Sequence, residues 1–324
     1  MASGLADVPI VVAGLALLPW GADRLVKASA SLARSAGVPT LVVGLTIVAL
    51  GTSAPELLVS TMAALQNKPG LSVGNAVGSD ITNLGLVVGI TAVLTPLRVR
   101  SGILRREFPA LLAAAGLTWA LLWNGTVSRL DGLLLLACMA GLVAWLVALA
   151  RRPPGGSDPA ADEYARSIPP AMPVRPAVLR VVAGLAALLV GSRLLVWGAT
   201  GLARSWGVSD LVIGLSIVAL GTSLPELAAS AAGALHGEHD IAVGNVIGSN
   251  LVNLLVVIGG PAVLHPLAVA PAVRLRDLPV MLAFTLALYA MCFGRGGRAG
   301  RVTRAEGALL VAAFAAYQGW LWIR

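Results

Sequence analysis

The sequence predicts an all-α integral membrane protein with ten transmembrane helices, arranged as two inverted five-helix repeats. Of its 324 residues, 57% are hydrophobic and only 12% are charged, a balance typical of membrane proteins. Apolar stretches recur along almost the whole chain, which leaves little room for a soluble domain. A third observation, an internal repeat, divides the chain into two similar halves.

Ten stretches approach or exceed the ~20 apolar residues that a helix needs to cross a bilayer. They lie at 8–30, 39–65, 73–94, 107–125, 130–150, 177–204, 210–235, 242–264, 277–293 and 305–322. Asp7 precedes the first stretch and no Lys or Arg does, so we expect this helix to be retained rather than removed as a secretory signal. Cys138 and Cys292 fall inside predicted helices, where packing as small apolar side chains is expected.

The net charge of +8 would favour a nucleic-acid partner in a soluble protein, but here the basic residues follow the membrane topology. With the N-terminus outside, thirteen Lys and Arg residues fall in inward loops and six in outward segments. The positive-inside rule therefore predicts a multi-pass plasma-membrane protein with both termini outside, and no nucleic acid as partner. The excess of Arg over Lys, 21 to 2, is typical of a GC-rich genome and favours a prokaryotic inner membrane.

The internal repeat aligns Gly21–Pro96 with Gly191–Pro266 at a constant offset and without a gap. Between residues 37–60 and 207–230, 17 of 24 positions are identical, which is too many for chance and indicates a duplication. Each half holds five predicted helices, and an odd number makes the second half enter the bilayer from the opposite face. Inverted repeats of this kind recur in secondary transporters, whose substrate site lies near the midplane where the repeats meet.

Three segments follow from the repeat. Residues 1–150 form the first repeat, with its motif at 44–84, and residues 177–324 form the second, with its motif at 214–254. Residues 151–176 are rich in Pro, Gly and charge and are predicted to be a flexible cytoplasmic linker.

Glu56 and Glu226 occupy equivalent positions inside the second and seventh predicted helices. An ionised carboxylate there costs ~2.5–3.5 kcal/mol on insertion scales, so it needs a partner. Pro55 and Pro225 precede the two carboxylates, and each removes one hydrogen bond of its helix. We expect a helix break that frees carbonyl oxygens at the midplane. The alternatives are that each carboxylate lies near a helix end and that each proline only kinks its helix.

Further polar residues surround the glutamates. Thr52, Ser53, Thr222 and Ser223 add hydroxyls beside them, with Ser53 and Ser223 at the i, i+3 spacing that shares a helix face with the glutamate of the same half. Bonding to their own backbone is the alternative role. A stripe with a four-residue period recurs in both halves and faces either a cavity or a partner helix. It consists of Asn75, Ser79, Asn83, Asn245, Ser249 and Asn253.

Together the halves offer carboxylates, hydroxyls, amides and carbonyls, with no His or Cys nearby. Hard oxygen ligands of this kind suit Ca²⁺ or Na⁺ rather than zinc or copper. The pattern predicts transport of inorganic cations. A channel or a membrane-embedded enzyme would also need polar groups at the midplane, but a channel gives no reason for inverted repeats, and no catalytic motif is present.

The motifs GTSAPEL with GTSLPEL, and GNAVGSDITN with GNVIGSNLVN, resemble those of the calcium/cation antiporter superfamily, most closely its sodium/calcium exchanger branch. The resemblance implies Ca²⁺ exchange for Na⁺ by alternating access, with no enzyme activity, no cofactor and no obligatory protein partner. It implies that Glu56 and Glu226 are shared by the Ca²⁺ and Na⁺ sites. It also implies further oxygen ligands, from Thr52, Ser53, Thr222, Ser223, Ser79, Ser249, Asn83 and Asn253 and from the carbonyls of Ala49 and Ala219.

The sequence departs from the motifs of this branch at one ligand position. The second motif of sodium/calcium members usually ends in Asp, where this chain has Asn253, so the site carries a formal charge of −2 rather than −3. Exchange of Ca²⁺ for H⁺ on the same fold is therefore the alternative function. Asp80, whose repeat mate is Asn250, is a candidate for the missing charge, and capping a helix or pairing with an arginine is the alternative role.

Overall fold

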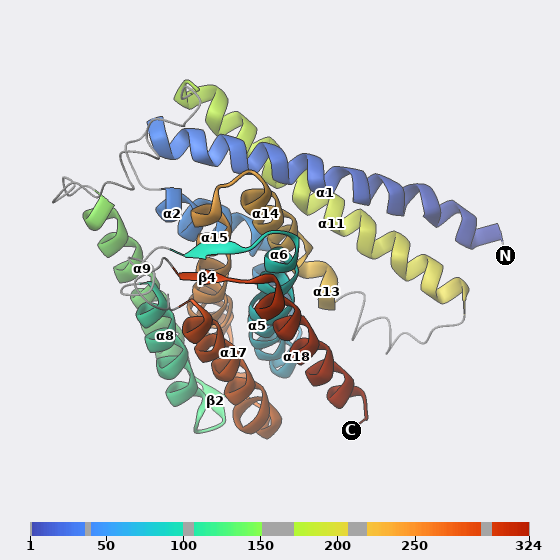
Figure 1. The fold of residues 1–324 in the computed structure, drawn as a ribbon. Coiled ribbons are helices and arrows are strands. Elements are labelled where there is room, and N and C mark those ends of the chain that lie inside the picture. Colours follow the sequence, from blue (N-terminus) through green and yellow to red (C-terminus); the bar gives the residue numbers. More distant parts are fainter. Residues whose placement is uncertain are drawn as a thin grey trace.

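The computed structural model describes residues 2–35, 40–99, 107–150, 172–206, 219–292 and 300–323, which are mostly helical (Figure 1). Five of the described helices are long and apolar enough to cross a membrane. A sixth crossing is formed if residues 40–52 and 54–65, which meet at a bend of 46°, are counted as one span. The predicted class of helical membrane protein is thereby supported. The linker, except for residues 172–176, and the start of the seventh predicted helix lie outside the described residues.

The first half contains one long helix, two interrupted helices and a hairpin of two further helices. Its elements are α1 (Ala2–Ser35), α2 (Thr40–Val43), η1 (Gly44–Val48), α3 (Ala49–Thr52), α4 (Ala54–Leu65), α5 (Pro69–Thr82), η2 (Asn83–Val87), α6 (Val88–Leu94), β1 (Leu97–Val99), α8 (Glu107–Leu122), β2 (Thr126–Val127) and α9 (Arg129–Ala150).

The second half repeats this order. Its elements are α11 (Val174–Ser205), α13 (Ala219–Thr222), α14 (Leu224–Leu235), α15 (His239–Val252), η4 (Asn253–Val257), α16 (Gly259–Leu264), β3 (Leu267–Ala268), η5 (Val273–Asp277), α17 (Leu278–Met291), β4 (Gly300–Val302) and α18 (Arg304–Ile323). The η segments are π-helical turns inside longer helices.

The constant offset between the repeats recurs in the bounds of the elements. The first and last residues of α14 are the repeat mates of the first and last residues of α4, and the same holds for α15 and α5. The π-helical turns η2 and η4 begin at Asn83 and Asn253, which are also repeat mates. The two halves therefore adopt the same local structure around the motifs.

Two small antiparallel sheets connect the halves to each other. β1 pairs with β4, with Leu97 opposite Val302, and β2 pairs with β3, with Val127 opposite Leu267. Because β3 is the repeat mate of β1, the same strand of each half pairs with a strand from the other half.

The long helices α1 and α11 lie side by side and extend beyond the rest of the bundle (Figure 1). Glycines permit their close approach: a Cβ added at Gly14 would lie 2.7 Å from the carbonyl oxygen of Gly191, and one at Gly184 would lie 2.7 Å from the amide of Leu25. Real Cβ atoms essentially never approach backbone this closely, so larger residues at these positions would separate the two helices.

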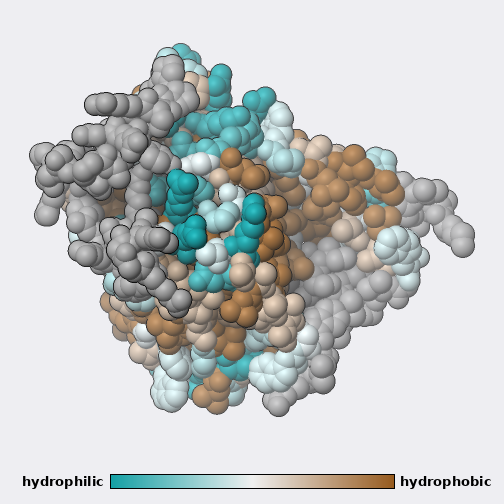
Figure 2. Space-filling model, viewed as in Figure 1, coloured by the Kyte–Doolittle hydropathy of each residue, from teal (hydrophilic) through white to brown (hydrophobic). Residues whose placement is uncertain are grey.

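Much of the surface is apolar, as expected of helices that face lipid. Large hydrophobic side chains such as Leu130 and Trp206 are about three-quarters exposed. Figure 2 shows hydrophobic residues, in brown, over the protruding part of the molecule that Figure 1 assigns to α1 and α11. Polar residues of the motifs such as Glu56, Ser79, Glu226 and Ser249 are instead buried on α4, α5, α14 and α15.

Candidate ion-binding site

The two glutamates lie at equivalent breaks in the helices. In the first half, α3 ends at Thr52 and α4 begins at Ala54, so Glu56 stands in the first turn of a new helix. Glu226 stands in the first turn of α14 in the same way. Proline suits this position, because an N–H in the first turn of a helix has no acceptor within the helix and its absence costs no hydrogen bond. The positive end of each helix dipole favours a carboxylate here.

Both carboxylates are almost completely buried, at 1% exposure, and lie close enough to interact electrostatically. The hydroxyl of Ser79 donates to Oε1 of Glu56 over 3.5 Å, and that of Ser249 donates to Oε1 of Glu226 over the same distance. The second oxygen of each carboxylate, Oε2, is buried and has no hydrogen-bond partner among the described residues. Each glutamate therefore has a free oxygen available to a cation.

Hydroxyl groups beside the glutamates form hydrogen bonds that cross between the halves. The sequence predicted instead that Ser53 shares a helix face with Glu56 of its own half. Ser53 Oγ donates to Oε1 of Glu226 over 3.1 Å, a carboxylate of the other half. Ser53 has non-helical dihedral angles between α3 and α4, so the i, i+3 rule for a continuous helix does not apply to it. Thr222 likewise lies within hydrogen-bonding reach of Glu56. The hydroxyls thus cross between the halves and connect each helix break to the opposite glutamate.

Two asparagines hold the broken helices in place. Asn75 Nδ2 donates to the backbone carbonyl of Glu56 over 3.1 Å and to Ser60 Oγ over 2.9 Å. Its repeat mate Asn245 makes the same bonds in the second half, to the carbonyl of Glu226 and to the hydroxyl of Ser230. Asn75 and Asn245 therefore fix the backbone that carries each carboxylate.

Thr52 and Ser223, two further candidate ligands, are buried at the breaks. Thr52 Oγ1 lies 3.3 Å from the carbonyl of Ala49, 3.1 Å from Asn245 Oδ1 and 3.5 Å from Ser249 Oγ. Ser223 Oγ is buried and accepts or donates no hydrogen bond within the described ranges. Ala219 is the first residue of α13, at the position that corresponds to Ala49.

One further group at the breaks was not anticipated from sequence. Ser192 of α11 donates its hydroxyl to the carbonyl of Gly221 over 2.6 Å, which is the carbonyl that Pro225 leaves without a helical partner. In the first half, Ala22 occupies the position of Ser192, so comparison of the repeats conceals this contact. One carbonyl freed by a proline is therefore satisfied by a serine of the long helix.

Ser192→Ala is expected to destabilise the protein by about 1–3 kcal/mol, because the buried carbonyl of Gly221 would lose its partner. Thermal unfolding of the purified protein in detergent micelles measures the change. Ser205→Ala is the matched control, since the Ser205 hydroxyl bonds the carbonyl of Leu202 in an exposed setting. Equal melting temperatures for Ser192→Ala and Ser205→Ala would contradict the assignment.

Asn83 and Asn253 each bond a residue of the opposite half. Asn83 Nδ2 donates to Oδ1 of Asn250 over 3.1 Å, and Asn253 Nδ2 donates to Oδ1 of Asp80 over 3.0 Å. We call Asp80, Asn83, Asn250 and Asn253 the quartet. All four are buried, and Asn83 and Asn253 begin π-helical turns, which are frequent at functional sites.

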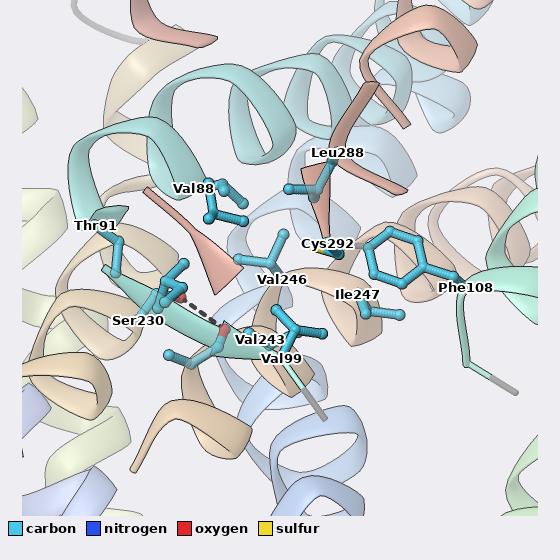
Figure 3. A pocket seen from close by; sticks show the side chains of 13 residues that line it. Val88, Thr91, Val99, Phe108, Ser230, Val243, Val246, Ile247, Leu288 and Cys292 are labelled. Carbon is cyan, nitrogen blue, oxygen red and sulfur yellow. Dashed lines mark hydrogen bonds between the residues drawn. The ribbon is translucent and has the colours of Figure 1, made fainter. Parts of the chain in front are cut away.

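The polar groups around the two glutamates are carboxylates, hydroxyls, amides and backbone carbonyls. Within the described ranges, no group of three or more His, Cys, Asp and Glu residues comes together to hold a metal. A separate small cavity beside α15 is lined mainly by apolar side chains such as Val246, Ile247 and Phe108 (Figure 3). The Ser230 hydroxyl bonds the Ala242 carbonyl at its edge, and no carboxylate lines it. The glutamates therefore suit a partly dehydrated cation better than this cavity does.

Comparison with known proteins agrees with the motifs. The profile of the family described as sodium/calcium exchanger protein matches residues 7–148 and 176–323. CaxA of Alkalimonas amylolytica is 46% identical over 95% of this chain and 96% of its own length. The inner membrane protein YrbG of Escherichia coli is 39% identical, over 90% of each chain. The solved structure of the sodium-calcium exchanger NCX_Mj superimposes with a TM-score of 0.82 at 30% identity, over 97% of this chain and 98% of that one.

These features define a multi-pass membrane transporter of inorganic cations rather than an enzyme. The chain belongs to the sodium/calcium exchanger protein family. The resemblance stated from the motifs is thereby confirmed.

Proposed function

We propose that this chain is a secondary active antiporter that exchanges Ca²⁺ for Na⁺ by alternating access. The observation that carries the proposal is the buried pair Glu56 and Glu226, supplied by equivalent helix breaks and linked by hydroxyls that cross between the halves. The two glutamates carry a formal charge of −2, which one Ca²⁺, two Na⁺ or two H⁺ neutralise. Competition for one pair of carboxylates couples opposite fluxes if the loaded carrier reorients and the empty one does not.

The oxygen ligands of this site are proposed to come from both halves. A Ca²⁺ ion takes 6–8 oxygens, more than two carboxylates supply, so hydroxyls, amides and carbonyls complete the shell. The proposed set is Glu56, Glu226, Thr52, Ser53, Thr222, Ser223, Ser79, Ser249, Asn83, Asn253 and the carbonyls of Ala49 and Ala219. The buried oxygens without partners support this set, since a bound cation would satisfy them.

We further infer ten transmembrane helices in two inverted five-helix repeats, with both termini outside. The shared offset of the helix bounds and the reciprocal strand pairs support the repeat. The name of the Escherichia coli relative YrbG, an inner membrane protein, supports a prokaryotic inner membrane. The sodium/calcium exchanger MaX1 of Methanosarcina acetivorans, 31% identical over 86% of this chain, supports Na⁺ as the counter-ion.

The amide at Asn253, where a carboxylate is usual by the motif resemblance, makes H⁺ the alternative counter-ion. Uptake of radioactive calcium into proteoliposomes tests this choice, with an outward gradient of sodium in one arm and of protons in the other. We expect the sodium gradient to drive accumulation. Accumulation driven by protons alone would identify a calcium/proton exchanger. Uptake down the calcium gradient without either counter-ion would indicate a channel, and no uptake in any arm would contradict calcium as substrate.

A further inference from the structure

Asp80 is a buried carboxylate of α5 with incomplete bonding. Its side chain is 0% exposed, and Oδ1 accepts one hydrogen bond, from Asn253 Nδ2. Its other oxygen, Oδ2, is buried and has no hydrogen-bond partner within the part of the chain that the structure describes. No Lys, Arg or His of the described ranges forms an ion pair with it. The arginine partner and the helix cap considered from sequence are therefore not what Asp80 contacts in this part of the chain.

Within the matching segments 74–83 and 244–253, the two halves differ in charge at Asp80. The glutamates, the serines and the asparagines of the polar stripe are identical in the two halves, whereas Asp80 faces Asn250 in the repeat alignment. The quartet consequently contains one carboxylate–amide pair, Asp80 with Asn253, and one amide–amide pair, Asn83 with Asn250.

The two pairs have different hydrogen-bonding freedom. An amide has both donors and an acceptor, so Asn83 and Asn250 can exchange the roles of donor and acceptor by rotating. A carboxylate only accepts, so Asn253 must present its Nδ2 to Asp80. The carbonyl oxygen of Asn253, which is buried and unpartnered, is then left available as a ligand in every arrangement of the pair.

We propose that Asp80 is a positioning residue of the ion site, which locks the amide of Asn253 so that its oxygen is offered to the transported cation. Asp80 also brings a third negative charge into the buried region, on the residue next to Ser79, whose hydroxyl bonds Glu56. A buried carboxylate with one hydrogen bond and no cationic partner is costly, and a cation in the adjoining site offsets that cost. This inference rests on the proposed exchange function.

A transposed pair tests the role of Asp80. Asp80→Asn removes the charge and the lock, and makes the pair equivalent to Asn83 with Asn250. Asp80→Asn combined with Asn253→Asp keeps the charge, and allows the new amide to donate to the new carboxylate. Both variants and the wild type are reconstituted, and the KM and maximal rate of counter-ion-driven calcium uptake are measured. Melting temperatures in detergent show whether each variant is folded.

We expect Asp80→Asn to raise the KM for calcium about tenfold and to change the maximal rate less than twofold. The transposed double variant is expected to return the KM to within about threefold of the wild type. An unchanged KM in Asp80→Asn would overturn the inference. A transposed variant with a KM for calcium as high as that of Asp80→Asn would overturn it too. If Asp80→Asn does not fold, the transposed variant alone tests the inference: a KM within about threefold of the wild type supports it, and a higher KM overturns it. Failure of the proposed function is distinguishable, because the wild type would then not take up calcium at all.

Discussion

Glu56→Gln and Glu226→Gln are each expected to abolish calcium transport, by a loss of at least about 100-fold. A divalent cation in a buried site would face one carboxylate instead of two, and breaking a buried charge pairing costs ~3–5 kcal/mol. A change of about 1.4 kcal/mol corresponds to a factor of ten in affinity, which gives the expected loss. Calcium uptake by proteoliposomes, measured across calcium concentrations, checks the prediction in the counter-ion gradient that drives the wild type.

Glu238→Gln is the matched control for these two substitutions. Glu238 forms a partly exposed ion pair with Arg34, over 3.4 Å, at the start of α15. Partly exposed ion pairs of this kind contribute little to stability, so calcium transport by Glu238→Gln is expected to remain near the wild-type level. Substantial uptake by Glu56→Gln or Glu226→Gln would mean that the missing carboxylate is not part of the ion site.

Gly248→Val is expected to eliminate transport through packing rather than through charge. A Cβ added at Gly248 would lie 2.6 Å from the carbonyl oxygen of Leu45 and 2.7 Å from the Cβ of Ala49. Overpacking in a well-packed core costs about 1–3 kcal/mol, and here backbone of η1 and α3 would have to move. Because α3 leads into the helix break at Ser53, we expect misplacement of Glu56 together with lower stability. Uptake and the melting temperature measure the two effects.

Gly141→Val provides the comparison for this substitution. A Cβ at Gly141 of α9 would meet no atom within 4 Å, so valine there should leave transport and melting temperature nearly unchanged. Normal transport by Gly248→Val would contradict the close contact of α15 with η1 and α3.

The sequence predicted the local structure that the two halves share. The constant offset between the repeats placed Glu56 and Glu226 in equivalent positions, and the prolines predicted the interruptions between α3 and α4 and between α13 and α14. The polar stripes were expected to face a cavity or a partner helix. Asn75 and Asn245 donate to the glutamate carbonyls of neighbouring helices, as the partner-helix interpretation expects, and a cavity facing the stripes stays a prediction.

The sequence could not predict contacts that depend on how the halves meet. Helical spacing placed Ser53 beside Glu56, but the interruption of the helix turns its hydroxyl to Glu226. Ser192 has no counterpart in the first half, so the repeat offered no signal for its bond to Gly221. The contact of Asp80 with Asn253 joins residues 173 positions apart, and only the packing of α5 against α15 and η4 brings them together.

If the two halves share one divalent-cation site, rather than each holding its own, one calcium ion should bind per chain. Equilibrium binding of radioactive calcium to the purified protein, with the amount bound per chain determined at saturation, measures this number. We expect one calcium per chain, displaced by the driving counter-ion, and no specific binding by either Glu56→Gln or Glu226→Gln. Two calcium ions per chain, with one retained in each single variant, would show that each half holds its own site.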